Sequence, residues 1–136
     1  MKDHIEHGYR THFEVRDYEC DMQGIVNNSV YQNYLEHARH QYIKTRGLDF
    51  AEITKRGIHL VLIKAELEYK RSLQSGDAFY IETSVERISK LKLAFIQTVH
   101  RTEDHQLMLS ARMTVTSTTK EGRPVVFEQA ELLLSQ

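Results

Sequence analysis

The sequence predicts an α+β fold in which one antiparallel β-sheet wraps around a single long α-helix. Two observations predict it: one long stretch with helical periodicity, and several stretches in which apolar and polar residues alternate. Short turns separate the later strands, which favours antiparallel pairing. A sheet with one apolar face and a helix with one apolar stripe bury both surfaces by packing together.

The long helix is expected over residues 29–46. Its apolar stripe recurs at helical spacing and consists of Tyr31, Leu35, Ala38 and Tyr42, widened by Tyr34. Ser29 and Gln32 fit a capping box at the start, and Gly47 is suited to ending the helix. This is the only long helix that the sequence predicts.

Strands are predicted at five places, over residues 9–16, 59–73, 78–88, 92–101 and 107–118. In the second strand one face should carry Ile63, Ala65, Leu67 and Tyr69. Short helices are expected over residues 50–56 and 127–134. The predicted order of elements is therefore one strand, the long helix and four further strands.

Composition indicates one domain over residues 1–136, with 40% hydrophobic and 27% charged residues and a net charge of −1. This charge gives no general attraction to nucleic acid or to a membrane surface. Cys20 is the single cysteine, which fits a reducing cytoplasm. The start of the chain is polar and no apolar run is long enough to cross a bilayer, so we expect a cytoplasmic protein.

The most informative segment is residues 17–31, Asp-Tyr-Glu-Cys-Asp-Met-Gln-Gly-Ile-Val-Asn-Asn-Ser-Val-Tyr. It places carboxylates, a turn glycine and two asparagines directly before the long helix. The first N–H groups of a helix lack partners and carry partial positive charge, so they can stabilise an oxyanion. A nearby carboxylate can act as a base or a nucleophile.

This segment and the order of elements resemble the hotdog-fold acyl-CoA thioesterases, most closely the 4-hydroxybenzoyl-CoA thioesterase branch. Supporting matches are Arg16 at the end of the first strand, the turn at residues 73–77, and Gly-Arg-Pro-Val at residues 122–125. The resemblance implies hydrolysis of an acyl-CoA thioester to a free acid and CoA. It also implies a homodimer or homotetramer with active sites between subunits.

The resemblance assigns the catalytic carboxylate to Asp21, as nucleophile or general base. It assigns the N–H that polarises the thioester carbonyl to Asn28, at the start of the helix. Gly24 would let the backbone turn close to the substrate, and Glu36 matches a second acidic position within the helix.

The other residues of this segment have plainer interpretations. Asp17 and Glu19 should be partly solvated, or paired with Arg16 or a helix residue, because three like charges are not buried together. Tyr31 is expected beside the pocket as a substrate contact, although most helix tyrosines should be core residues. Cys20 has no histidine paired with it by motif, so a catalytic thiol is not expected.

CoA carries phosphates, and the predicted cationic contacts are Lys90, Lys92 and Arg123. Neither the histidines near the start (His4, His7 and His12) nor His37 with His40 form a recognised ligand set, so we expect no metal and no cofactor.

Three alternatives remain open. The chain could hydrolyse acyl-carrier-protein thioesters, or bind acyl-CoA without catalysis. A hydratase on the same fold is less favoured, because the chain lacks the Asp-x-x-x-x-His pair that such enzymes use.

Overall fold

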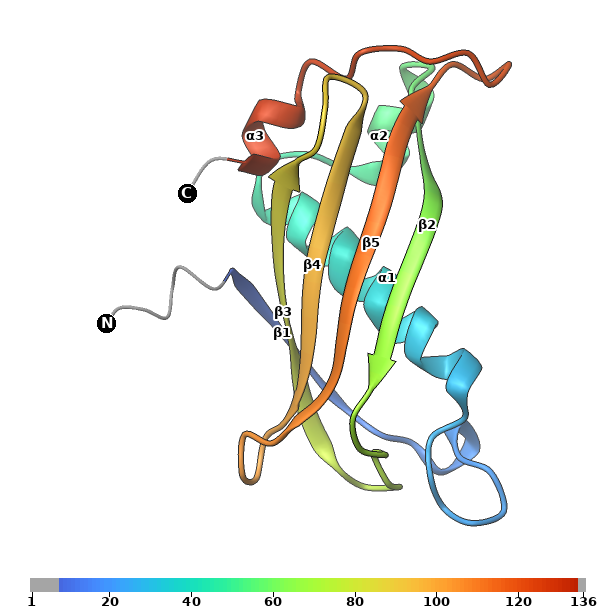
Figure 1. Cartoon of the computed structure of the whole chain (residues 1–136), viewed down its shortest axis with the longest axis vertical. Helices are drawn as coiled ribbons and strands as arrows, with labels where there is room; N and C mark the ends of the chain where they lie inside the picture. Colours follow the sequence, from blue (N-terminus) through green and yellow to red (C-terminus); the bar gives the residue numbers. More distant parts are fainter. Residues whose placement is uncertain (1–7, 135–136) are drawn as a thin grey trace.

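The computed structural model describes residues 8–134; residues 1–7, with His4 and His7, and residues 135–136 lie outside the described part. A five-stranded antiparallel sheet packs one face against helix α1 (Asn28–Thr45), which runs obliquely behind it in Figure 1. The predicted fold class, an antiparallel sheet around one long helix, is confirmed. No helix within residues 8–134 is long and apolar enough to span a membrane.

The spatial order of the sheet differs from the order along the chain. It runs β1-β3-β4-β5-β2, where the strands are β1 (Tyr9–Glu14), β2 (His59–Tyr69), β3 (Ala78–Arg87), β4 (Lys92–Arg101) and β5 (Leu107–Thr118). Consecutive hairpins join β3, β4 and β5, as expected. β2 instead pairs with β5, so the chain crosses from one edge of the sheet to reach β3.

Three predicted strands end earlier than expected, and the third of the five, β3, does so by one residue, at Arg87. The second stops at Tyr69, because the N–H groups of Lys70 and Arg71 both donate to the carbonyl of Met108, at 2.9 and 3.1 Å, and the regular ladder breaks. The first strand ends at Glu14. The short helices are α2 (Phe50–Lys55) and α3 (Ala130–Leu134), and α3 starts later than the expected residue 127.

A β-bulge in β2 changes which residues face the helix. The register with β5 shifts between Leu62 and Lys64, and Leu62 pairs with Val115. An extra residue in one strand interrupts the alternation of faces. The expectation that Ile63 continues the face of Ala65, Leu67 and Tyr69 by regular alternation is therefore wrong, since Ile63 is the inserted residue.

The core lies between α1 and the inner face of the sheet. The helix buries six side chains, namely Tyr31, Tyr34, Leu35, Ala38, Tyr42 and Ile43. Phe79 and Phe95 are fully or almost fully buried opposite them. Gly47 follows the helix with φ +82°, the left-handed conformation that suits a helix C-terminus. The predicted apolar stripe is confirmed.

Candidate active site

The loop that precedes α1 folds back on itself around Asp21. The Asp21 N–H donates to the carbonyl of Ile25 at 2.9 Å, and the Gly24 N–H donates to the carbonyl of Asp21 at 3.0 Å. Gly24 has φ +81°, a conformation that other residues adopt only with strain. The turn glycine thus has the local role that the sequence predicts.

The Asp21 side chain is exposed and uses one of its two oxygens to hold this turn. Oδ1 accepts the N–H of Gln23 at 2.9 Å and that of Ile25 at 3.3 Å. Within residues 8–134, no hydrogen bond reaches Oδ2. The carboxylate is therefore fixed in orientation while one oxygen remains open.

The two competing carboxylates have structural partners. Glu19 accepts the hydroxyl of Tyr34 at 2.7 Å and the N–H of Arg16 at 2.9 Å, and its side chain is only 13% exposed. Asp17 accepts the hydroxyl of Ser75. The expectation that Glu19 pairs with Arg16 or a helix residue is confirmed for both partners. Burial and the Glu19 contact also raise the pKa of Tyr34.

The N-terminus of α1 is left without a side-chain cap. The N-cap residue is Asn27, whose Nδ2 donates to the carbonyl of Glu19 at 3.4 Å and whose side chain makes no capping bond. The predicted capping box is wrong, because the helix begins at Asn28 and Ser29 is already inside its first turn. No acceptor within residues 8–134 receives the N–H of Asn28. This donor is available to a ligand.

The turn at residues 73–77 supports the loop from the opposite side. The Ser75 N–H donates to the carbonyl of Gly24 at 3.2 Å, and the Val26 N–H donates to that of Leu73 at 3.0 Å. The Leu73 N–H in turn donates to the hydroxyl of Tyr31 at 3.0 Å. Residues 17–31 and 73–77, two segments on which the family resemblance depends, are far apart in the sequence and lie in direct contact in the fold.

Tyr31 and Cys20 have their side chains directed to structural roles. Tyr31 is 2% exposed and packs edge-on against Tyr69, with ring centroids 5.6 Å apart. Burial and then the carboxylates of Asp17, Asp21 and Glu19 raise the pKa of the Cys20 thiol. The thiol is therefore protonated at neutral pH and is a poor nucleophile.

Other predicted site residues are not brought to Asp21 within one chain. Lys90 lies in the β3–β4 turn, Lys92 begins β4, and Arg123 follows β5, whereas the loop before α1 is at the opposite end of the sheet (Figure 1). β3 has 10 residues, so at about 3.3 Å each it separates these ends by roughly 30 Å. Glu36 lies two turns along α1, with a carboxylate oxygen 4.0 Å from Nε2 of His40.

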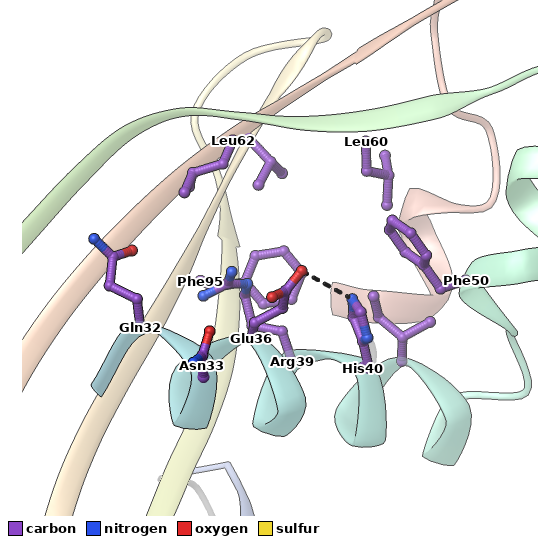
Figure 2. A pocket seen from close by; sticks show the side chains of 11 residues that line it. Gln32, Asn33, Glu36, Arg39, His40, Phe50, Leu60, Leu62 and Phe95 are labelled. Atoms are coloured by element: carbon purple, nitrogen blue, oxygen red, sulfur yellow. Dashed lines mark ion pairs between the residues drawn. The ribbon is translucent and has the colours of Figure 1, made fainter. Parts of the chain in front are cut away.

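Sequence reasoning missed a cavity of about 230 Å³ between α1, α2 and β2. Figure 2 shows Gln32, Asn33, Glu36, Arg39 and His40 projecting from the helix toward Leu60 and Leu62 on β2, with Phe50 at one end. One signal was present in the sequence: Arg39 follows Leu35 by four residues, so a charged side chain borders the apolar stripe. No trio of His, Cys, Asp or Glu side chains in residues 8–134 is arranged to hold a metal ion.

The fold and the carboxylate loop before α1 together define a hotdog-type protein with a candidate acyl-transfer site. Residues 15–132 match the family model of the thioesterase-like superfamily, and the chain belongs to this family.

Three proteins illustrate the relationship. The chloroplastic acyl-acyl carrier protein thioesterase ATL2 of Arabidopsis thaliana is 32% identical over 82% of this chain and 59% of its own length. YneP of Bacillus subtilis, provisionally described as an acyl-CoA thioesterase, is 25% identical over 91% of this chain and 90% of its own. A crystal structure of a hypothetical protein from Aquifex aeolicus superposes with a TM-score of 0.85 at 28% identity, covering 92% of this chain and 98% of that one. The chain spans about three fifths of the length of the plant relatives it matches.

Proposed function

We propose that the protein is an acyl-CoA thioesterase that hydrolyses an acyl-CoA thioester to a free carboxylic acid and CoA. The observation that carries the proposal is the pairing of a carboxylate with one open oxygen, at Asp21, and an unused N–H at Asn28 across one short loop. Family membership and the likeness to YneP support it.

The N-terminus of α1 would polarise the thioester. The carbonyl oxygen accepts the Asn28 N–H, and the partial positive charge of the helix end stabilises the negative charge that develops there. Because Asn27 does not cap this end with its side chain, the substrate competes with no acceptor from residues 8–134. Gly24 keeps the loop tightly turned beside the helix start.

Asp21 would then act in one of two ways. As a nucleophile it bonds to the carbonyl carbon, CoA leaves as a thiolate that takes a proton from water, and hydroxide or water cleaves the resulting anhydride. As a general base it takes a proton from water, which attacks the carbonyl carbon, and the proton passes to the departing thiolate. After single turnover in ¹⁸O-water, label in Asp21 establishes the nucleophilic route with water attacking Asp21's own carbonyl carbon. Label in the product acid alone is shared by the general-base route and by attack of water on the acyl carbon of the anhydride.

The direct test is thiol release across a panel of acyl-CoA esters by the wild type and by Asp21→Asn. The amide oxygen of asparagine can still accept the turn's N–H groups, so the variant should fold. We expect kcat to fall by about 10²–10⁴-fold, the usual contribution of a positioned acid–base group. Asp49→Asn is the matched control, because the exposed Asp49 also accepts the N–H two residues ahead with one oxygen, at 2.8 Å. Near-normal turnover by Asp21→Asn contradicts the role.

The likeness to ATL2 favours a second candidate, hydrolysis of acyl-carrier-protein thioesters. Rates on the same acyl group attached to CoA and to carrier protein decide between the two carriers. A non-catalytic acyl-CoA-binding module would bind these esters without releasing thiol.

We propose further that two subunits pair along β2. Among residues 8–134 this edge strand pairs only with β5, and it carries Val61, Ile63 and Tyr69, each more than 40% exposed. Tyr18 and Met22, in the loop before α1, are also exposed, at 77% and 103%. A dimer, or a tetramer built from it, would cover these surfaces and is tested by sedimentation.

In such an assembly the cations Lys90, Lys92 and Arg123 would act on CoA bound to a neighbouring subunit. Tyr31 would contribute through packing beneath the site, and Glu36 through the cavity beside α1. The expected cytoplasmic location stays a prediction.

A further inference from the structure

The cavity between α1, α2 and β2 combines apolar walls with one partly buried cation. Its apolar walls include Phe50, Leu60, Leu62, Phe95 and Val115. At about 230 Å³ it is smaller than the sites that enclose whole drug-sized ligands. It is therefore of a size for an acyl group, with the nucleotide part of CoA outside.

Arg39 is held at this cavity by a buried amide. Its Nη1 donates to Oε1 of Gln97 at 3.1 Å. Gln97 is fully buried and its Nε2 donates to the carbonyl of Leu35 at 3.0 Å and to the hydroxyl of Thr83 at 3.1 Å. The network fixes the guanidinium from the core side.

The remaining donors of Arg39 have no acceptor in the described part of the chain. A guanidinium has five N–H donors, and within residues 8–134 Arg39 makes only the bond to Gln97 and no ion pair. Burial lowers the pKa of Arg39, and the charge of Glu36 opposes this change. A partly desolvated cation with unused donors is unfavourable unless an acceptor joins it.

The cavity is placed to receive an acyl chain from the candidate active site. It begins at Gln32 and Asn33, about one turn after Asn28, and extends to Ile43. Arg39 is 11 residues beyond Asn28, which corresponds to about 16 Å of rise along the helix, and its side chain leans back toward the N-terminus. If the thioester carbonyl binds at the helix start, the part of the acyl group that reaches Arg39 lies several bonds from that carbonyl.

We propose that this cavity holds the acyl group and that Arg39 donates a hydrogen bond to an oxygen which that group carries away from the thioester. The inference rests on the proposed thioesterase function. A neutral hydroxyl or oxo group fits better than a carboxylate, since the Glu36 carboxylate, 4.0 Å from Nε2 of His40, lines the same cavity and repels a second anion (Figure 2). The oxygen can belong to an aliphatic chain or to an aromatic ring.

The test compares kcat/KM for matched pairs of CoA esters: 8-hydroxyoctanoyl against octanoyl, and 4-hydroxybenzoyl against benzoyl. The wild type should favour the hydroxylated member of at least one pair, which identifies the source of the oxygen. Arg39→Met keeps much of the apolar stem and removes the donors. It should lower the hydroxylated-to-plain ratio by about tenfold or more, as expected for a lost charge-assisted hydrogen bond.

Arg112→Met is the matched control, because Arg112 pairs with Glu86 at 2.9 Å on the outer face of the sheet and should leave the ratio unchanged. A ratio in Arg39→Met equal to that of the wild type overturns the proposal, as does a wild type that prefers neither hydroxylated ester. If Arg39→Met does not fold, Arg39→Leu, which likewise has no donor, replaces it, and an unchanged ratio in that variant overturns the proposal equally.

Binding separates this inference from the proposed function. Calorimetry with 8-hydroxyoctanoate against octanoate, and with 4-hydroxybenzoate against benzoate, measures the preference without turnover. One outcome is that no ester releases thiol, while the wild type still binds the hydroxylated acid more tightly and Arg39→Met does not. This outcome refutes the thioesterase assignment and supports the proposed role of Arg39 in the cavity. The opposite outcome is thiol release without a preference for hydroxylated esters or acids in any assay. It supports the thioesterase assignment and refutes the proposed role of Arg39.

Discussion

The loop before α1 and the cavity beside α1 are two parts of one candidate site, and they are built in different ways. The loop consists of consecutive residues whose backbone groups bond to one another, and its key side chain, Asp21, is exposed. The cavity draws its walls from two helices and three strands, and its key side chain, Arg39, is fixed by buried Gln97. The difference suggests that the loop supplies chemistry and the cavity supplies selectivity.

The largest effect among the following changes should come from loosening the loop from the helix. Tyr34→Phe removes the 2.7 Å bond to Glu19 and keeps the ring packed on Phe79. A hydrogen bond to a charged group contributes about 1.5–3 kcal/mol, so urea unfolding should show a loss of that order. Tyr18→Phe, at a side chain 77% exposed, is the control. Equal stability of the two variants would show that Glu19 does not anchor the loop.

A smaller loss is expected when the turn itself is strained. Gly24 has φ +81° and nothing within 4 Å of where a Cβ would lie, so Gly24→Ala meets no clash and only the backbone cost remains. That cost is about 1–2 kcal/mol for an L-residue in the left-handed region. Thermal unfolding measures it, and thiol release should fall for plain and hydroxylated esters alike. A change confined to one class of ester would contradict the division between loop and cavity.

Changing a cavity wall should affect acyl selectivity with little effect on folding. Leu62 lines the cavity and is already 39% exposed. Leu62→Ala should reduce kcat/KM for octanoyl-CoA by up to about fivefold, which corresponds to roughly 1 kcal/mol of lost apolar contact. Ile63→Ala, at the neighbouring bulge residue outside the cavity wall, is the control. Equal effects of both variants would indicate a general disturbance of the β2 edge.

The smallest effect concerns the pH dependence of stability. Burial lowers the pKa of His40, and Arg39, His37 and Lys44 act in the same direction, whereas Glu36 opposes them. The unfolded chain then takes up a proton more readily than the folded one, so stability is complete above about pH 6.5 and falls as the pH decreases below that value. The melting temperature should fall less between pH 7.5 and 5.5 in His40→Gln than in the wild type. Identical pH profiles would contradict this.

The sequence was sufficient for much of the fold because its signals are local. Helical spacing located α1 to within one residue at each end, and alternation located β4 and β5. It could not give the place of β2 beside β5, which depends on pairing between distant segments. The bulge at Ile63 could not be predicted either, since an apolar residue continues the alternating pattern at this position.

The candidate site also has one part that local sequence signals predict and one part that depends on contacts between distant segments. Asp21, Gly24 and Asn28 could be selected from one continuous motif, whose turn geometry depends on neighbouring residues. The cavity could not, because Leu60, Phe95 and Arg39 meet only in the folded chain. The capping box failed because a one-residue shift of the helix start changes which side chain can cap it.

The most direct test of this account measures kcat/KM for the matched pair of esters in which the wild type favours the hydroxylated member, either 8-hydroxyoctanoyl-CoA with octanoyl-CoA or 4-hydroxybenzoyl-CoA with benzoyl-CoA. It uses three proteins: the wild type, Asp21→Asn and Arg39→Met. The account predicts that Asp21→Asn lowers both values by the same factor, about 10²-fold or more. It predicts that Arg39→Met changes the ratio between them. Near wild-type turnover by Asp21→Asn on both esters would contradict the assignment of the chemistry to the loop.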